Sequence, residues 1–422
     1  MSLEPETLAA DAVVAPPRTR STALEVPTFR WYWILTWISN TGDGMENVIR
    51  NVLVFQLVGR EAAPFWLGAM VFAHWVPFTF FSLYGGTLAD RYDGRRVQIV
   101  SQVVLFVAAA GTAIAALTNA INVWWLFGLL LVHGFAGAIG TPAQQTLIHG
   151  IVGKERLLSA VSLNSTARQF SQVVGPAVAG FIVLVFGPGL GFLINAVTFL
   201  PVLVFLARLR LPPLYERERQ PVVEAVREGV GFVRQRPLLG SLIAIEASSV
   251  VFLGHTFSSL LIVFAKDRFP GSDLAYPLLL VASGIGAIVS ATYLAYARPV
   301  TRTGLVIALT AMAEMVAILL FAFATQFALA LTLMFVVGAT AVITQSLTNT
   351  TLQLSAPDRI RGRVMGAYSM GTQGLRVANG PLLGGLATLF GVPLAVAGSA
   401  GVVLVVLAAL TLAVPQLRAA DT

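Results

Sequence analysis

The sequence predicts an all-α membrane protein in which twelve transmembrane helices form two pseudo-symmetric six-helix bundles. Of its 422 residues, 56% are hydrophobic and only 11% are charged, whereas charged residues make up about 25% of a soluble domain. Apolar stretches of about 20 residues, enough to cross a bilayer, recur along the chain. A Gly-Pro motif near position 175 recurs near position 380, as a duplicated unit requires. These observations exclude soluble and disordered proteins.

The twelve predicted spans leave two tails and one long polar linker. The approximate spans are 31–58, 64–88, 97–117, 122–149, 158–186, 189–209, 239–264, 274–297, 303–324, 327–354, 364–390 and 392–414. The expected regions are a disordered cytoplasmic tail at 1–28, the first bundle at 29–209, the linker at 210–238, the second bundle at 239–414 and a cytoplasmic tail at 415–422.

The first tail and the linker are both polar, but a helix is predicted only in the linker. Residues 1–28 contain several prolines and lack the apolar core of a signal peptide. Within the linker, an amphipathic helix on the inner membrane face is predicted at 222–236. Four valines at helical spacing favour it: Val222, Val226, Val230 and Val233.

The basic residues indicate which side of the membrane each loop faces. The formal net charge is +7, which in a polar protein would suggest a nucleic-acid partner. On the predicted spans, however, most basic residues fall in loops on one side, and Arg60, Lys266 and Arg268 lie on the other. Because positive loops face the cytoplasm, both termini are expected there, in a bacterial inner membrane. Charge that alternates from loop to loop does not form a nucleic-acid surface.

Several kinds of chemistry have no residues to support them. The chain has no cysteine and four histidines, and no histidine pair has metal-ligand spacing. No phosphate-binding G-x-x-x-x-G-K-[ST] sequence is present, and no nucleophile–base pair is visible. We therefore expect no metal, no cofactor and no enzymatic activity, and an ion gradient rather than ATP as the energy source.

Residues 85–96 carry the first resemblance to a known family. They read Gly-Gly-Thr-Leu-Ala-Asp-Arg-Tyr-Asp-Gly-Arg-Arg, which resembles the loop 2–3 signature of the major facilitator superfamily, G-x-L-A-D-R-x-G-R-R. The sequence departs from it at Asp93 and Gly94. The resemblance implies a gating motif in which Asp90 accepts hydrogen bonds from basic groups and from the N-terminus of the eleventh span when the cytoplasmic side is closed. Its members are Gly86, Asp90, Arg91, Arg95 and Arg96.

Three further segments resemble exporting members of the superfamily. The fifth span contains Gly175, Pro176 and Gly180 in a Gly-Pro-x-x-x-Gly motif, where small residues allow close helix approach and the proline bends the helix. Residues 42–44 and 352–368 resemble the branch that includes enterobactin exporters and macrolide-efflux proteins.

Charged residues inside the spans are candidate functional residues, because each costs about 2.5–3.5 kcal/mol at mid-bilayer. In the first span, polar residues share one helical face: Asn40, Asp43, Glu46, Asn47 and Arg50. Glu46 and Arg50 are four residues apart and can neutralise each other. Asp43 then has no local partner, which makes it the first candidate for carrying a coupling proton. The alternative is a structural polar cluster in which Asp43 caps or bridges helices.

Other spans supply further candidates. Glu46 and Glu246 are the remaining proton-coupling candidates, although Glu246 can also be a solvated residue at a helix end. The superfamily resemblance implies a central cavity. The candidates for lining it are Asn40, Asn47, Arg50, His133, Arg168, His255 and Arg376. The two arginines of the fifth and eleventh spans can pair with the acids or bind an anionic substrate. Glu314 has no evident role.

The expected function is secondary active transport by alternating access. Protons moving inward would drive export of a small amphipathic or drug-like compound. The alternatives are a narrow-substrate exporter of a siderophore or natural product, a lipid or lysolipid translocator and, remotely, a non-transporting membrane sensor. The expected partners are the small-molecule substrate, protons and the lipid bilayer, and we expect a monomer.

Overall fold

The computed structural model describes residues 22–91, 93–210, 222–272, 274–296, 301–357 and 360–418. Within these ranges the chain forms helices joined by short turns, and it forms no β-strand. The predicted all-helical fold class is therefore confirmed.

The helices are long and follow one another closely. Their bounds are η1 Ala23–Glu25, α1 Pro27–Arg91, α2 Gly94–Leu117, α3 Val123–Arg208, α4 Val222–Arg234, α5 Pro237–Phe252, α6 Gly254–Arg268, α7 Ala275–Tyr296, α8 Thr303–Ala322, α9 Phe327–Ser355, α10 Arg361–Ser369, the π-helical segment η2 Met370–Gly374, α11 Arg376–Phe390, α12 Val392–Ala413 and η3 Pro415–Leu417.

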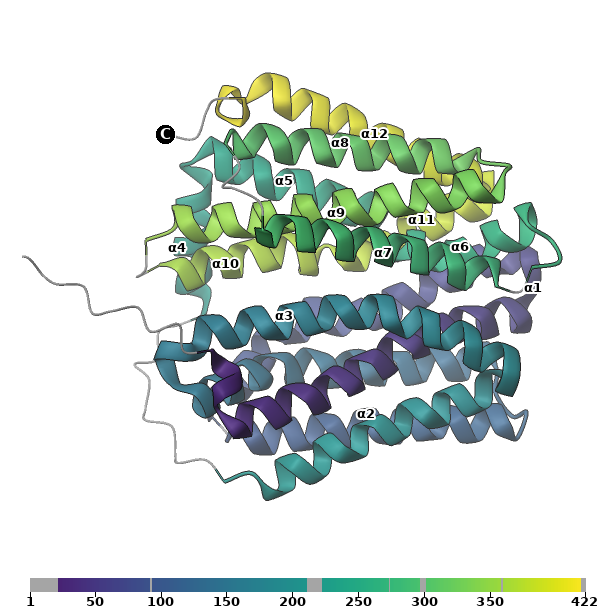
Figure 1. Ribbon diagram of the computed structural model, residues 1–422, viewed down its shortest axis with the longest axis horizontal. Coiled ribbons are helices and arrows are strands. Elements are labelled where there is room, and N and C mark those ends of the chain that lie inside the picture. The colour runs from purple at the N-terminus through teal and green to yellow at the C-terminus, as the bar shows by residue number, and fades with distance from the viewer. Residues whose placement is uncertain are drawn as a thin grey trace, which may run out of the picture.

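Three glycines interrupt the two longest helices. Gly59 in α1 has φ 73°, and Gly153 and Gly187 in α3 have φ 71° and 77°. Glycine tolerates this backbone conformation because it has no Cβ. All three fall between predicted spans, and α1 turns back on itself in Figure 1. The glycines therefore end the helical segments where the sequence predicts connections.

Membrane-spanning character is evident from helix length and composition. Within the described residues, nine helical segments are long and apolar enough to cross a membrane. The segment that begins at Pro27 extends 55 residues through the Gly59 break. A single crossing needs only about 20 residues, so this segment is long enough for two.

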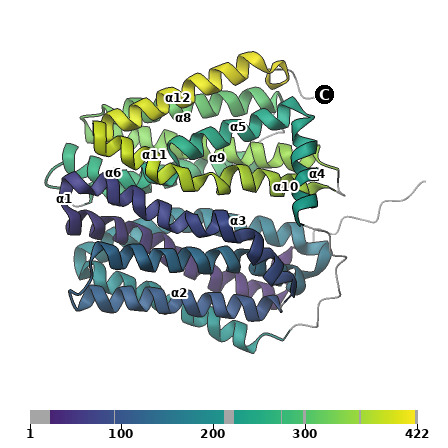
Figure 2. The same ribbon diagram turned by 180° about the vertical axis from the view of Figure 1, so that it is seen from behind.

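The first three long helices and the later helices occupy opposite sides of the molecule. Figures 1 and 2 show α1, α2 and α3 on one side and α5 to α12 on the other. A continuous apolar core joins the two sides and includes Ile49 and Leu261. At their contact, Gly68 of α1 lies against α11, where an added Cβ would be 2.9 Å from the Cα of Gly384. Absent side chains thus let the two helices approach closely.

The predicted linker helix forms, but its described apolar side chains cover protein. Phe232 and Val233 of α4 pack against a buried cluster that includes residues of α10. Glu228 forms an ion pair with Arg363 of α10, and Gly229 lies against the Arg363 carbonyl group. This part of α4 therefore packs on α10, and its position on the inner membrane face stays a prediction.

The four valines that favoured the linker helix do not form one buried face. Val230 remains 45% exposed, whereas Val233 is partly buried against the α10 cluster. The side chains of Val222 and Val226 lie outside the described residues. Helical spacing predicted the helix, and contacts with a distant segment decided which side is covered.

Both predicted tails need shorter bounds. Residues 1–21 and 419–422 lie outside the described residues. Ala23, placed by the sequence in the first tail, is fully buried, and its N–H donates to Ser159 Oγ at 3.1 Å. In the second tail, Leu417 is also fully buried. Apolar contacts with the bundle therefore order residues next to both predicted boundaries.

We expect Gly229→Val to detach α4 from α10, because the added side chain collides with the Arg363 backbone. Overpacking of this kind costs about 1–3 kcal/mol. Limited trypsin digestion should cleave the α4 arginines several-fold faster. Gly231→Val is the matched control, since a Cβ there meets no atom within 4 Å. Equal cleavage rates in the two variants would contradict this packing.

Candidate functional site

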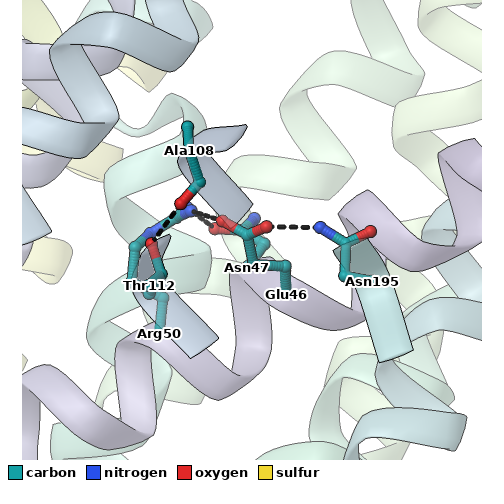
Figure 3. Close-up of polar contacts among 6 residues, drawn as sticks. All are labelled: Glu46, Asn47, Arg50, Ala108, Thr112 and Asn195. Carbon is teal, nitrogen blue, oxygen red and sulfur yellow. Dashed lines mark hydrogen bonds and ion pairs between the residues drawn. The ribbon is translucent and has the colours of Figure 1, made fainter. Parts of the chain in front are cut away.

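The polar face of α1 is held together by internal pairing. Arg50 Nη1 lies 3.4 Å from Glu46 Oε1, which confirms that these two residues pair. Asn195 of α3 donates a hydrogen bond to Glu46 Oε2, and Arg50 also donates to Asn47 Oδ1. Figure 3 shows Glu46 between Asn195 and the Arg50–Asn47 pair. Neutralisation and hydrogen bonding together offset the cost of burying these charges.

Asp43 lies on the same helix, and one of its carboxylate oxygens lacks such support. Its Oδ1 is buried and has no hydrogen-bond partner. Arg168 of α3 is exposed and forms no ion pair with Asp43 among the described residues. Asn40, one turn earlier, is half-buried. A buried carboxylate oxygen that lacks a partner is uncommon and marks a site of function or strain.

Close contact between α1 and α3 fixes the position of this polar face. A Cβ on Gly44 would lie 2.8 Å from the Ser171 carbonyl oxygen, and a Cβ on Gly175 would lie 2.7 Å from the Gly44 carbonyl carbon. Pro176 follows, buried inside α3. Gly180 instead faces the other side of the molecule. We call α1 to α3 the first half and α5 to α12 the second half. A Cβ on Gly180 would lie 2.8 Å from Pro277 Cβ in the second half. The Gly-Pro motif therefore serves contacts both within and between halves.

A break divides the helix predicted at 239–264 into α5 and α6. Gly254 at the break has φ 36°. The side chain of Asn379 in α11 pairs with backbone groups on both sides of the break. Its Oδ1 accepts a hydrogen bond from Thr256 N–H at 2.8 Å, and its Nδ2 donates to the Val251 carbonyl oxygen at 3.2 Å. Broken helices inside membranes require such partners and often border binding sites. Asn379 was not predicted from the sequence. Its position directly before the second Gly-Pro motif is the one sequence feature that points to it.

An aromatic and cationic cluster lies between the halves. We call Trp75, His255 and Arg376 the interface cluster. The Trp75 and His255 rings stack with centroids 5.6 Å apart, and the Arg376 guanidinium lies 4.7 Å from the Trp75 ring centroid. Arg376 Nη1 is 2.6 Å from His255 Nε2. The cluster joins two predicted candidates to Trp75, which the sequence did not single out.

Two further histidines lie next to the interface cluster. The ring of His74, adjacent to Trp75 in α1, is 5.4 Å from the ring of His133 in α3. Within the described part of the chain, no group of three histidine or acidic side chains is arranged to hold a metal ion. His74 and His133 continue the ring contacts of Trp75 toward α3.

The eleventh predicted span is also irregular. The stretch expected at 364–390 consists of α10, the π-helical η2 and α11. Thr79 of α1 donates to the Gly374 carbonyl at 3.0 Å, across the two halves. Glu246 of α5 is half-buried and accepts from the Tyr368 hydroxyl at 2.7 Å, so it is not simply a solvated end residue. Short π-segments often occur at functional sites.

Glu314 of α8 is half-buried, and nothing in the structure explains it.

Only part of the predicted gating motif can be placed. The side chains of Gly86, Asp90 and Arg91 lie outside the described residues. Arg95 donates from Nε and Nη2 to the carbonyl oxygens of residues 206 and 207, each at 2.6 Å, and Arg96 is exposed. Arg95 therefore caps the C-terminus of α3.

Comparisons with known proteins agree over most of the chain. The family model described as "Transmembrane secretion effector" matches residues 19–422. The enterobactin exporter EntS of Shigella flexneri is 25% identical over 352 residues, covering 81% of this chain and 83% of that protein. The enterobactin exporter EntS of Escherichia coli SMS-3-5 is 24% identical over 355 residues, with the same coverage.

Solved structures share the fold. The nucleoside transporter NupG has a TM-score of 0.68 and 14% identity, covering 91% of this chain and 98% of that one. A D-xylose–proton symporter has a TM-score of 0.70 and 15% identity, covering 92% of this chain and 98% of that one. At these identities the likeness concerns the fold alone.

We expect Asn379→Ala to destabilise the protein, because it leaves a buried N–H and a buried C=O without partners at the α5–α6 break. Each unpaired group costs about 1–3 kcal/mol. The thermal midpoint of the detergent-purified protein should fall by several degrees. Thr388→Ala on α11 is the control, since that hydroxyl donates only to its own helix, at Gly384. Equal midpoints for the two variants would exclude the bridging role.

Proposed function

We propose a transport function on one premise: the chain belongs to the transmembrane secretion effector family, a branch of the major facilitator superfamily. In this proposal the protein exports a small amphipathic compound across the bacterial inner membrane. The observation that carries it is the family match over residues 19–422, supported by enterobactin exporters that align with 81% of the chain.

The proposal assigns twelve spans to two bundles of six. The glycine breaks divide α1 into two spans and α3 into three. The pair α5–α6 forms one span, as does the series α10–η2–α11, and α2, α7, α8, α9 and α12 each form one. The linker that contains α4 then separates two parallel repeats. With the basic loops in the cytoplasm, both termini are cytoplasmic.

Alternating access is supported by contacts at the end of the molecule that carries the Gly59 turn, which we call the Gly59 end. Arg60 Nε lies 2.7 Å from Asp267 Oδ1, and Asn51 Nδ2 donates to the Tyr276 hydroxyl at 2.9 Å. Both pairs join the two halves. In the proposed orientation this end faces outward, so these contacts close the outer side. Rocking of the bundles would separate them and release substrate outside.

The interface cluster is the proposed substrate-binding region. Trp75 and His255 offer aromatic faces, and Arg376 supplies a positive charge between the two halves. Few polar groups in an aromatic setting are typical of small-molecule sites. The enterobactin-exporter relatives favour a narrow, siderophore-like natural product over a broad set of drugs.

Proton coupling is proposed for the two acidic positions on the inner helices. Asp43 has a buried oxygen without a partner, and Glu246 accepts a hydrogen bond from Tyr368 of the eleventh span. Protonation of these groups would favour one orientation of the bundles and substrate the other.

Locking the Gly59 end should stop transport. The chain has no native cysteine, so an Arg60→Cys/Asp267→Cys pair can be cross-linked without reaction at other residues of the chain. We expect cross-linking to abolish export, reversibly with a cleavable reagent, because the halves can no longer separate. Glu25→Cys/Arg156→Cys is the matched control, since this 3.9 Å ion pair lies within the first half. Full export by a cross-linked Gly59 end would refute alternating access through it.

Export itself is testable in cells that lack their own enterobactin exporter. We expect the chain to restore enterobactin secretion, a protonophore to abolish it, and Asp43→Asn to lower it at least tenfold at equal membrane abundance. Glu155→Gln, at an exposed carboxylate of α3, should behave like the unaltered protein.

A cationic fluorescent dye provides the second substrate class in the same cells. Dye efflux without enterobactin secretion would support the broad drug-export alternative. Activity toward neither compound, with the protein present in the membrane, would count against both versions of the proposal.

A further inference from the structure

An open groove lies on the outer surface of the first half, away from the interface cluster. It has a volume of about 830 Å³ and runs between the start of α1 and the end of α3. Its walls are mostly apolar and include Trp31, Leu200, Val204 and Phe205. Trp31 is 56% exposed and Val204 is 50% exposed. In a membrane-spanning chain, exposed apolar walls of this kind face the lipid.

One end of the groove is positively charged. Arg208 and Arg210 line it, and neither forms an ion pair among the described residues. Two carbonyl groups at the C-terminus of α3 already have a cationic partner, because Arg95 donates hydrogen bonds to the carbonyl oxygens of Leu206 and Ala207. Within the described part of the chain, two guanidinium groups without an ion-pair partner therefore lie where the apolar wall ends.

The groove lies at the level where lipid head groups are expected. Figures 1 and 2 place the start of α1 and the end of α3 at the same end of the molecule as α4. Helices leave the bilayer at their termini, and tryptophan concentrates at this boundary. Trp31 lies in the first turns of α1 and lines the groove. An amphipathic ligand here would keep its apolar part in the bilayer and its charged part at the surface.

We propose that this groove binds an anionic phospholipid. An acyl chain lies along Leu200 and Val204, and the phosphate group accepts hydrogen bonds from Arg208 and Arg210. Basic pockets between helices bind anionic head groups in this way. A peptide segment fits poorly, because apart from the two arginines Thr28 is the main hydrogen-bonding side chain of the lining. The site is separate from the proposed transport site and does not depend on which compound is exported.

The proposal is tested by counting lipids retained by the full-length protein. The purified protein in mild detergent is titrated with phosphatidylglycerol or phosphatidylethanolamine and measured by native mass spectrometry. We expect tighter binding of one phosphatidylglycerol. Arg208→Gln/Arg210→Gln should weaken that binding about twenty-five-fold, since each basic residue near a membrane surface contributes about fivefold. Its phosphatidylethanolamine binding should change little.

Two further variants separate the groove from general surface charge. Val204→Trp fills the groove but keeps both arginines, and it should weaken phosphatidylglycerol binding at least tenfold. Arg302→Gln removes an exposed arginine outside the groove and should leave binding unchanged. Gel filtration and circular dichroism of each variant establish that it is folded.

Three results would overturn the proposal. The first is unchanged phosphatidylglycerol binding by the double arginine variant. The second is full binding by Val204→Trp, which would move the lipid to another surface. The third is equal affinity for the two lipids in the unaltered protein. None of these measurements involves transport, so they are independent of the exporter assignment.

Discussion

The absence of water in the bilayer core is the constraint on which the rest of this structure depends. Hydrocarbon offers no hydrogen-bond partner, so each polar group within the spans needs one from the chain itself. Glu46 meets this demand through Arg50 and Asn195. Asn379 meets it for the backbone at the α5–α6 break. Asp43 Oδ1 does not meet it, and Asp43 is the one acidic side chain among the described buried groups that lack a partner, which makes it the foremost candidate among the acids.

Glycines, which have no side chain, matter to the helix packing as much as the polar residues do. Gly44 and Gly175 bring α1 and α3 together within the first half, whereas Gly68 brings α1 against α11 of the second half. The two copies of the Gly-Pro motif thus form different contacts: Gly175 packs within its own half and Gly380 packs across the interface. Both motifs provide a small surface on their helix, and the surrounding helices determine what packs against it.

The two proposed sites for small amphipathic molecules differ in their place in the molecule. The interface cluster lies between the halves, where movement of one half relative to the other would expose or cover it. The groove beside Trp31 lies within the first half, between α1 and α3. A lipid held there would steady the first half in the bilayer while the interface changes. The two sites would therefore serve transport and anchoring separately.

The sequence by itself determined features that depend on near neighbours: the helical fold class, the turns at Gly59, Gly153 and Gly187, and the Glu46–Arg50 pair four residues apart. Tertiary structure alone decided the partners that are distant along the chain. Asn195 lies 149 residues from Glu46, and Asn379 lies 123 residues from Thr256. It also decided that α4 packs on α10. Local spacing fixes which residues share a helical face, but only packing of whole helices fixes what that face meets.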